Sequence, residues 1–107
     1  MKAEGAVARP TKLSEGEIKD RLKSMPVWSL EKGKLHREFR FADFKEAFAF
    51  MTRVATVADQ LDHHPEWFNV YSTVRVDLAT HDAGGITDLD FQLAAAMTTA
   101  AGGRGGS

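Results

Sequence analysis

A long amphipathic helix is the feature that most constrains how this chain folds. Asp43 is followed three residues later by Glu46, the spacing of a capping box at a helix N-terminus. Apolar residues then recur at helical spacing in two adjacent rows: Phe44, Phe48, Met51 and Ala55 in the first, and Phe50, Val54, Val57 and Leu61 in the second. The pattern predicts a helix over residues 44–61 whose wide apolar face packs against a sheet.

Shorter patterns on both sides of this helix predict the remaining elements. Capping boxes at Ser14 with Glu17 and at Thr87 with Asp90 indicate two further helix starts. Alternating apolar residues indicate strands. In chain order the predicted elements are a helix over 14–24, a β-hairpin over 27–41 with its turn at 32–34, the helix over 44–61, a strand over 69–80, a short fourth strand within 83–87, and a helix from 87 to about 101.

The element order α-β-β-α-β-β-α predicts the fold class. It is typical of an α+β fold in which a four-stranded antiparallel sheet carries three helices on one face. A chain of 107 residues is long enough for one domain. We expect that domain over residues 12–101, with flexible tails at 1–11 and 102–107. Because such a sheet leaves its other face and its edges uncovered, we expect a homodimer or homotetramer.

Composition narrows the classes of function. Fourteen basic residues stand against fifteen acidic ones, a balance that leaves no strong field to attract nucleic acid. There is no cysteine, so disulfides and thiolate chemistry are excluded. No apolar run approaches the ~20 residues of a membrane-spanning helix, and the N-terminus lacks the pattern of a signal peptide. We therefore expect a cytoplasmic protein that binds neither nucleic acid nor a membrane directly.

Three of the four histidines fall at the ends of predicted elements. His63 and His64 follow the long helix, and His81 follows the strand over 69–80. A helix that runs back along a strand brings these ends together. Imidazole has an unperturbed pKa of about 6.5, so such a group can both give and take protons at neutral pH. His36 lies inside the hairpin and is interpreted as an exposed strand residue.

Two other interpretations of the gathered histidines stay open. Three imidazoles can bind zinc and leave one coordination position open. Against a metal site, His63 and His64 are adjacent and diverge, and the helical spacing HExxH is absent. Alternatively, these two residues hydrogen-bond carbonyl groups at the C-terminus of the helix and have no chemical role.

Aromatic and acidic residues near these ends also have two interpretations. Trp28 and Trp67 could stack on a flat heterocycle, but aromatic residues beside a sheet are more often core, and we expect core for Trp67. Asp62 and Asp90 could orient the histidines or bind a polar ring, and Asp90 is equally explained as a capping residue. Asp59 is interpreted as solvated helix surface.

The segment from Phe50 to Ala94 resembles the signature of a known family. It reads FMTRVATVADQLDHHPEWFNVYSTVRVDLATHDAGGITDLDFQLA. Its helix ends in DHHPEW, its strand ends in TH, and a glycine-containing loop precedes a T/S-x-x-D-x-x-LA helix. In these features it is similar to the pterin-4a-carbinolamine dehydratase family, also known as the dimerisation cofactor of a homeodomain transcription factor. The resemblance covers about residues 14–100 and implies the same α+β fold.

The resemblance implies dehydration of 4a-hydroxytetrahydrobiopterin, the product of aromatic amino-acid hydroxylases, to quinonoid dihydropterin and water. The reaction delivers a proton to the departing 4a-hydroxyl group and removes one from ring nitrogen N5, with no metal and no cofactor. By the resemblance, His63 and His81 are the acid and base, and His64 binds and orients the ring. Further residues implied for the pterin pocket are Asp62, Ala79 and Thr80, with Trp28 at the rim and Asp90 as a carboxylate that supports a histidine.

Two other functions stay open for a chain with this resemblance. The same fold can serve as a dimerisation or coactivator module for a transcription factor, with the histidines idle. It can also bind a pterin in another pathway, such as molybdenum cofactor metabolism. The presence of all three matching histidines favours the enzyme.

Overall fold

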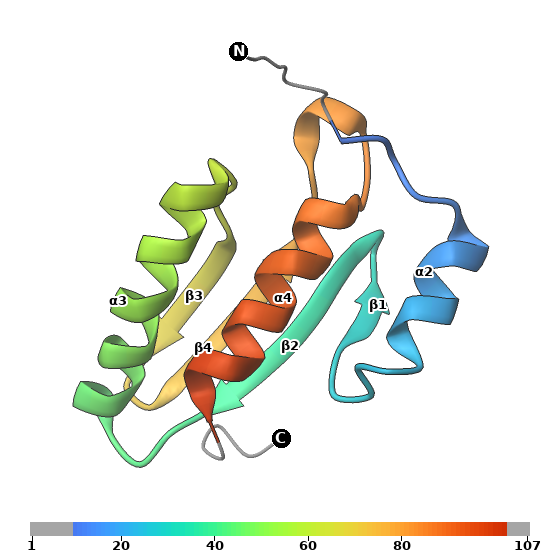
Figure 1. Ribbon diagram of the computed structural model, residues 1–107. Coiled ribbons are helices and arrows are strands. Elements are labelled where there is room, and N and C mark those ends of the chain that lie inside the picture. The colour runs from blue at the N-terminus through green and yellow to red at the C-terminus, as the bar shows by residue number, and fades with distance from the viewer. Residues whose placement is uncertain (1–9, 103–107) are drawn as a thin grey trace.

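A computed structural model describes residues 10–102, which form one four-stranded antiparallel sheet and three helices (Figure 1). The strand order is β1-β2-β4-β3, and the predicted fold class and element order are confirmed. Almost all of the expected tails, 1–11 and 102–107, lies outside the described residues. The elements are α2 (Glu15–Leu22), β1 (Ser29–Glu31), β2 (Lys34–Arg40), α3 (Phe44–Leu61), β3 (Glu66–Val70), β4 (Thr73–Leu78), the 3₁₀ turn η1 (His81–Ala83) and α4 (Asp88–Ala101).

One face of the sheet packs against α3 and α4, and α2 lies beside β1 (Figure 1). Along β2 and β4 every second side chain points into this layer, as the alternating sequence predicts. Each large apolar side chain that is buried contributes about 1.5–3 kcal/mol to stability. The largest fully buried apolar side chains are Leu35, Phe39, Val74, Val76 and Leu78 from the sheet, Phe50, Val54, Leu93 and Met97 from the helices, and Ile86 from the loop before α4. Within residues 10–102, we find no helix that combines the length and the apolar character needed to span a bilayer.

The apolar face of α3 is only partly covered by the sheet, although its sequence predicts a wide contact. Phe50 and Val54, from the second apolar row, are fully buried against the sheet. Phe44 and Phe48, from the first row, are 48% and 52% exposed, and their rings lie tilted against each other with centroids 5.6 Å apart. The expectation that both rows face the sheet is therefore wrong for these two residues, although Met51 of the first row packs against the core. Phe44 and Phe48 form an apolar strip on the surface.

The C-terminus of α3 turns the chain sharply back toward the sheet. Asp62 adopts the left-handed conformation with φ 50°, and the backbone N–H of His63 donates to the carbonyl oxygen of Ala58 at 3.0 Å. This is the hydrogen-bond pattern of a Schellman helix end. Pro65 disfavours helical geometry at the residue before it, so the helix cannot continue. The His63 side chain is buried as a result of this turn.

The segment predicted as a single strand over 69–80 is a hairpin. Strands β3 and β4 pair antiparallel and are joined by the two-residue turn 71–72. Tyr71 has φ 48°, a conformation that usually requires glycine or asparagine, so the sequence carried no recognisable turn signal. The side-chain amide of Asn69 donates to the carbonyl oxygens of Tyr71 and Thr73, at 3.2 and 2.9 Å, and holds the turn closed.

The predicted strand within 83–87 is also wrong. This part of the chain has only an isolated bridge between Thr80 and Gly85, in which the Thr80 N–H donates to the Gly85 carbonyl oxygen at 2.9 Å. The intervening residues form η1, which ends at Gly84 with φ 78°. The fourth strand of the sheet is instead β3, which pairs with β4 and forms one edge of the sheet. The tight loop leaves His81 exposed just beyond β4.

Replacing Tyr71 by glycine is expected to stabilise the fold. The left-handed conformation strains a residue that carries a Cβ atom by about 1–2 kcal/mol, and part of this gain is lost to the greater chain entropy of glycine. Because the Tyr71 side chain is 64% exposed, few contacts are lost. We expect the free energy of unfolding in urea to rise by about 0.5–1 kcal/mol. A decrease of similar size would show that contacts of the Tyr71 ring outweigh the backbone strain.

Candidate active site

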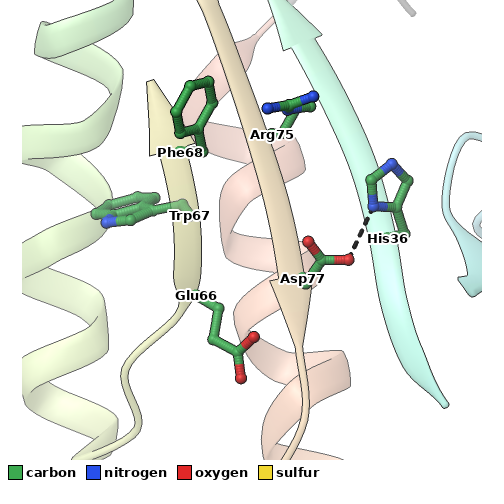
Figure 2. A pocket seen from close by; sticks show the side chains of 6 residues that line it. All are labelled: His36, Glu66, Trp67, Phe68, Arg75 and Asp77. Carbon is green, nitrogen blue, oxygen red and sulfur yellow. Dashed lines mark hydrogen bonds and ion pairs between the residues drawn. The ribbon is translucent and has the colours of Figure 1, made fainter. Parts of the chain in front are cut away.

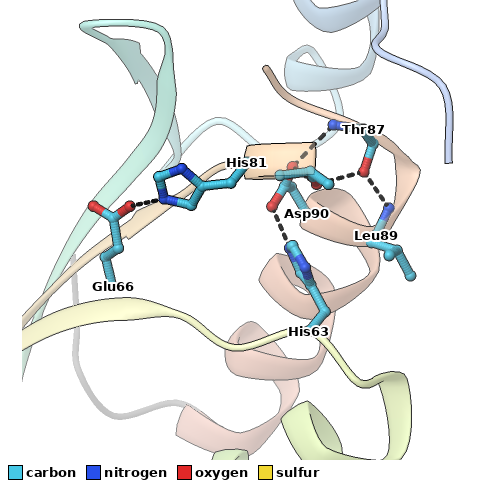
Figure 3. Close-up of polar contacts among 7 residues, drawn as sticks. His63, Glu66, His81, Thr87, Leu89 and Asp90 are labelled. Carbon is cyan, nitrogen blue, oxygen red and sulfur yellow. Dashed lines mark hydrogen bonds and ion pairs between the residues drawn. The ribbon is translucent and has the colours of Figure 1, made fainter. Parts of the chain in front are cut away.

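The residues singled out from the sequence gather where α3 and β4 end and α4 begins (Figure 3). Residues 62–64 follow α3, and residues 79–81 follow β4. Asp90 lies in the first turn of α4. The prediction that the helix end and the strand end lie near each other is confirmed by the contacts that Asp90 makes with both. Trp28 is the one selected residue that lies elsewhere.

Asp90 joins the three segments through one buried carboxylate. Its Oδ2 atom accepts the backbone N–H of Thr87 at 2.9 Å and the hydroxyl of Thr80 at 2.8 Å. Its Oδ1 atom lies 2.5 Å from Nε2 of His63. Asp90 has no exposed surface, and a buried charge is tolerated only with such partners. Capping α4 and orienting a histidine, the two alternatives from the sequence, are therefore both roles of this residue.

His63 is fixed by its contact with Asp90. Its side chain is almost fully buried, and Nε2 points at the carboxylate (Figure 3). A ring nitrogen that faces a carboxylate is assigned as the protonated one. Nδ1 is then the nitrogen that can exchange a proton with another group. A carboxylate on one nitrogen of an imidazole sets both its tautomer and its orientation, which is a useful arrangement for proton transfer.

His64 has a looser environment. Its side chain is 61% exposed, and Nε2 lies 3.1 Å from Oδ1 of Asp59 on the last turns of α3. Asp59 is on the surface of the helix, as expected, but it also contacts this histidine. An ion pair exposed to this degree contributes at most about 1 kcal/mol. The His64 ring can therefore turn toward a ligand at little cost.

His81 faces a carboxylate that was not among the residues selected from the sequence. Its Nε2 atom lies 3.4 Å from Oε2 of Glu66, the first residue of β3, and its ring is 86% exposed. Glu66 Oε1 accepts a hydrogen bond from Lys34 Nζ at 2.7 Å. The hydrogen bond from Lys34 lowers the pKa of Glu66, and His81 adds a smaller lowering. Glu66 is part of the DHHPEW stretch, but its contact with Lys34 follows only from the pairing of strands.

A shallow cavity of about 340 Å³ lies on the open face of the sheet beside Glu66. Figure 2 shows its lining side chains, which come from β2, β3 and β4. His36 lines it and is not simply exposed, because its Nδ1 atom lies 2.9 Å from Oδ1 of Asp77. Arg75 stacks on the ring of Phe68, with its guanidinium carbon 4.5 Å from the ring centroid. Two aromatic and four ionisable side chains line the cavity, and the histidines other than His36 are not among them.

Trp28 lies outside the candidate site. It is 3% exposed, its indole N–H donates to Thr98 Oγ1 at 3.1 Å, and its ring packs edge-on against Phe39. Thr98 is eight residues beyond Asp90, or about 12 Å along α4. The structure therefore does not bring Trp28 together with the histidines within the chain. Its inward position just before β1 makes it part of the core. Trp67, in contrast, packs against the core as expected.

The three histidines at these element ends each face a different carboxylate. His63 faces Asp90, His64 faces Asp59 and His81 faces Glu66. In the part of the chain that the structure describes, no three His, Cys, Asp or Glu side chains form a group able to hold a metal ion. This arrangement gives no support to the interpretation of the histidines as a zinc site.

Comparison with known proteins identifies the relatives of this chain. The model of the family described as Pterin 4 alpha carbinolamine dehydratase matches residues 11–100. A protein of Solibacter usitatus, provisionally named as a pterin-4-alpha-carbinolamine dehydratase, is 57% identical over 93 residues, which are 87% of this chain and 98% of that protein. A protein of Sinorhizobium medicae with the same provisional name is 54% identical over 98 residues, or 90% of this chain and 93% of that protein.

Solved structures agree with the fold. A crystal structure of a protein described as a transcriptional coactivator/pterin dehydratase from Brucella melitensis has a TM-score of 0.83 and 44% sequence identity. The match covers 86% of this chain and all of that chain. A pterin dehydratase-like protein described as a RuBisCO assembly factor in the alpha-carboxysome has a TM-score of 0.58 at 20% identity, with 70% of this chain and 87% of that chain covered. That second likeness concerns the fold alone.

Replacing Asp90 by asparagine is expected to weaken the fold. The amide group cannot accept hydrogen bonds at both of its ends, so Thr87 N–H, the Thr80 hydroxyl or His63 is left with a buried and unpaired group. We expect the free energy of unfolding in urea to fall by about 2–3 kcal/mol. Asp59→Asn removes the exposed partner of His64 and should cost less than about 0.5 kcal/mol. Equal losses in the two variants would contradict the central role of Asp90.

Proposed function

The chain belongs to the pterin 4 alpha carbinolamine dehydratase family, and we propose that it dehydrates 4a-hydroxytetrahydrobiopterin to quinonoid dihydropterin and water. The observation that carries the proposal is that His63 and His81 each have Nε2 beside a carboxylate at neighbouring element ends. The contact with Asp90 holds the His63 ring with Nδ1 available for proton transfer. We further propose that the reaction serves tetrahydrobiopterin recycling after an aromatic amino-acid hydroxylase, in the cytoplasm.

The proposed reaction consists of two proton transfers and one bond cleavage. The C4a–O bond breaks as the hydroxyl group takes a proton and leaves as water. Nitrogen N5 loses its proton, and its electron pair forms the N5=C4a double bond. Nothing is oxidised or reduced, so no redox cofactor enters the balance. An acid and a base are sufficient, and general acid–base groups contribute about 10²–10⁴-fold each.

We assign these transfers to His63 and His81 as a pair. The buried Asp90 carboxylate stabilises His63 when its ring becomes positively charged, and Glu66 does the same for His81 at the surface. His64 is proposed to bind and orient the pterin ring, because its contact with the exposed Asp59 is easily exchanged for a ligand. Segments 62–64 and 79–81 would line the pterin site, with Asp62, Ala79 and Thr80 as lining residues.

Association with a second copy or another partner is the second proposal. The exposed strip on α3, formed by Phe44 and Phe48, gives an apolar surface that a homodimer or homotetramer would cover. A coactivator role, by which the Brucella melitensis protein is described, would also use such a surface. The non-catalytic alternative therefore rests on the α3 strip, and the catalytic proposal rests on the histidines.

The catalytic proposal is tested by generating the carbinolamine in situ and following its decay by ultraviolet absorbance. The protein should accelerate the decay. His63→Ala and His81→Ala should each lower kcat at least about 10-fold, because each removes a proton-transfer group. His36→Ala is the matched control and should leave kcat unchanged, since His36 faces Asp77 on the open side of the sheet.

Three outcomes would contradict this proposal. Decay no faster than the spontaneous reaction would remove the enzymatic function. Equal tolerance of alanine at all four histidines would favour the interpretation of His63 and His64 as helix-capping residues. Activity that is lost to a chelator and restored by zinc would favour metal chemistry.

Association is tested by light scattering on two matched variants. Phe48→Asp places a charge in the α3 strip and should shift the protein toward monomer. Phe68→Asp places the same charge on the open face of the sheet, where Phe68 is 51% exposed, and should leave the oligomeric state unchanged. The opposite result would assign the contact between copies to the sheet face instead of α3.

A further inference from the structure

Glu66 lies between a lysine and the exposed histidine that is proposed above as a proton-transfer group. Figure 3 shows the His81 ring directed toward Glu66 and away from the buried pair of His63 and Asp90. The two oxygens of Glu66 contact different residues. Oε1 accepts a hydrogen bond from Lys34 at 2.7 Å, and Oε2 lies 3.4 Å from His81 Nε2. One carboxylate therefore connects β2, β3 and the loop after β4.

Strand pairing explains how these three side chains meet. Glu66 is opposite Asp77 of β4, and Asp77 is opposite His36 of β2. Lys34 begins β2 two residues before His36, directly after the tight turn at residues 32–33. Its side chain crosses β4 on the sheet face away from the helices and reaches Glu66. Lys34 thus holds Glu66 at the end of the sheet where His81 emerges.

The contact with Lys34 has little value for stability alone. The two side chains are 36% and 44% exposed, so solvent screens most of their attraction. The contact between Lys34 and Glu66 also shifts the pKa of both groups. Lys34 lowers the pKa of Glu66, and Glu66 raises the pKa of Lys34. Glu66 is therefore a carboxylate across the pH range in which imidazole titrates, and it accepts a hydrogen bond without donating one.

We propose that Glu66, held in place by Lys34, is a positioning residue that keeps the proton of His81 on Nε2 and so makes Nδ1 the nitrogen that exchanges a proton with the pterin. The inference rests on the proposed function. It gives His81 the same arrangement that Asp90 gives His63, with a carboxylate on Nε2 of each ring. The difference is that the Asp90 pair is built into the core, whereas the Glu66 pair lies in solvent.

The kinetic test compares Glu66→Gln with Asp77→Asn. Both changes remove an exposed carboxylate from the same sheet face with little change of shape, but only Glu66 faces His81. Since the contact is long and exposed, we expect Glu66→Gln to lower kcat by about 5-fold and to leave KM unchanged. Asp77→Asn should leave both constants unchanged. Lys34→Met should also lower kcat, by a smaller factor than Glu66→Gln does.

A double variant separates positioning of His81 from any other role of Glu66. If Glu66 acts through His81, then Glu66→Gln should have no further effect in a His81→Ala background. The tautomer of His81 supplies a readout that needs no substrate. Nitrogen chemical shifts of the His81 ring should indicate the Nε2–H form in the wild-type protein and a mixture of both tautomers in Glu66→Gln.

The possible outcomes distinguish this inference from the function on which it rests. An active wild-type protein with equal kcat in Glu66→Gln and Asp77→Asn would overturn the role of Glu66 alone. Additive losses in the double variant, or an unchanged tautomer in Glu66→Gln, would do the same. A wild-type protein without dehydratase activity would overturn the proposed function and, with it, the catalytic use of His81.

Discussion

The arrangement of this site depends on the hydrogen bonds that the buried carboxylate of Asp90 makes. It accepts hydrogen bonds from Thr87 at the start of α4 and from Thr80 after β4, and it faces His63 after α3. Three elements distant in sequence are thereby fixed to one fully buried group. Because an unpaired charge in the core is costly, these partners stabilise the fold and also orient the histidine. Stability and site geometry are therefore coupled here.

The two proposed proton-transfer groups illustrate different ways of holding an imidazole. His63 is restrained by packing, since both it and Asp90 lie inside the protein. His81 is 86% exposed and forms an ion pair with Glu66, which in turn accepts a hydrogen bond from Lys34. A buried contact tolerates little movement, whereas an exposed ion pair exchanges readily with water. On the proposed function, the rigid side of the site would define the pterin position and the exposed side would allow the pterin to bind and leave.

Helix ends were predictable where the capping residues lie close together in the sequence. The capping residues at Ser14, Asp43 and Thr87 were found because each lies three residues from its partner. The hairpin turn at Tyr71 was missed because that residue adopts a left-handed conformation without glycine or asparagine. The surroundings of Trp28 were not predictable, because an aromatic residue beside a strand is compatible with either a core or a pocket wall and its hydrogen bond to Thr98 spans 70 positions.

The sequence by itself determined the fold class, the element order and the three histidines at element ends. These features depend on periodicity, on capping and on residue type, which are properties of short segments. The tertiary structure alone decided which carboxylate faces which histidine. Asp90 contacts His63, 27 positions away in the sequence. Glu66 contacts Lys34, 32 positions away, because their strands β3 and β2 lie on either side of β4. Such pairs follow from strand order and helix packing, which no local pattern records.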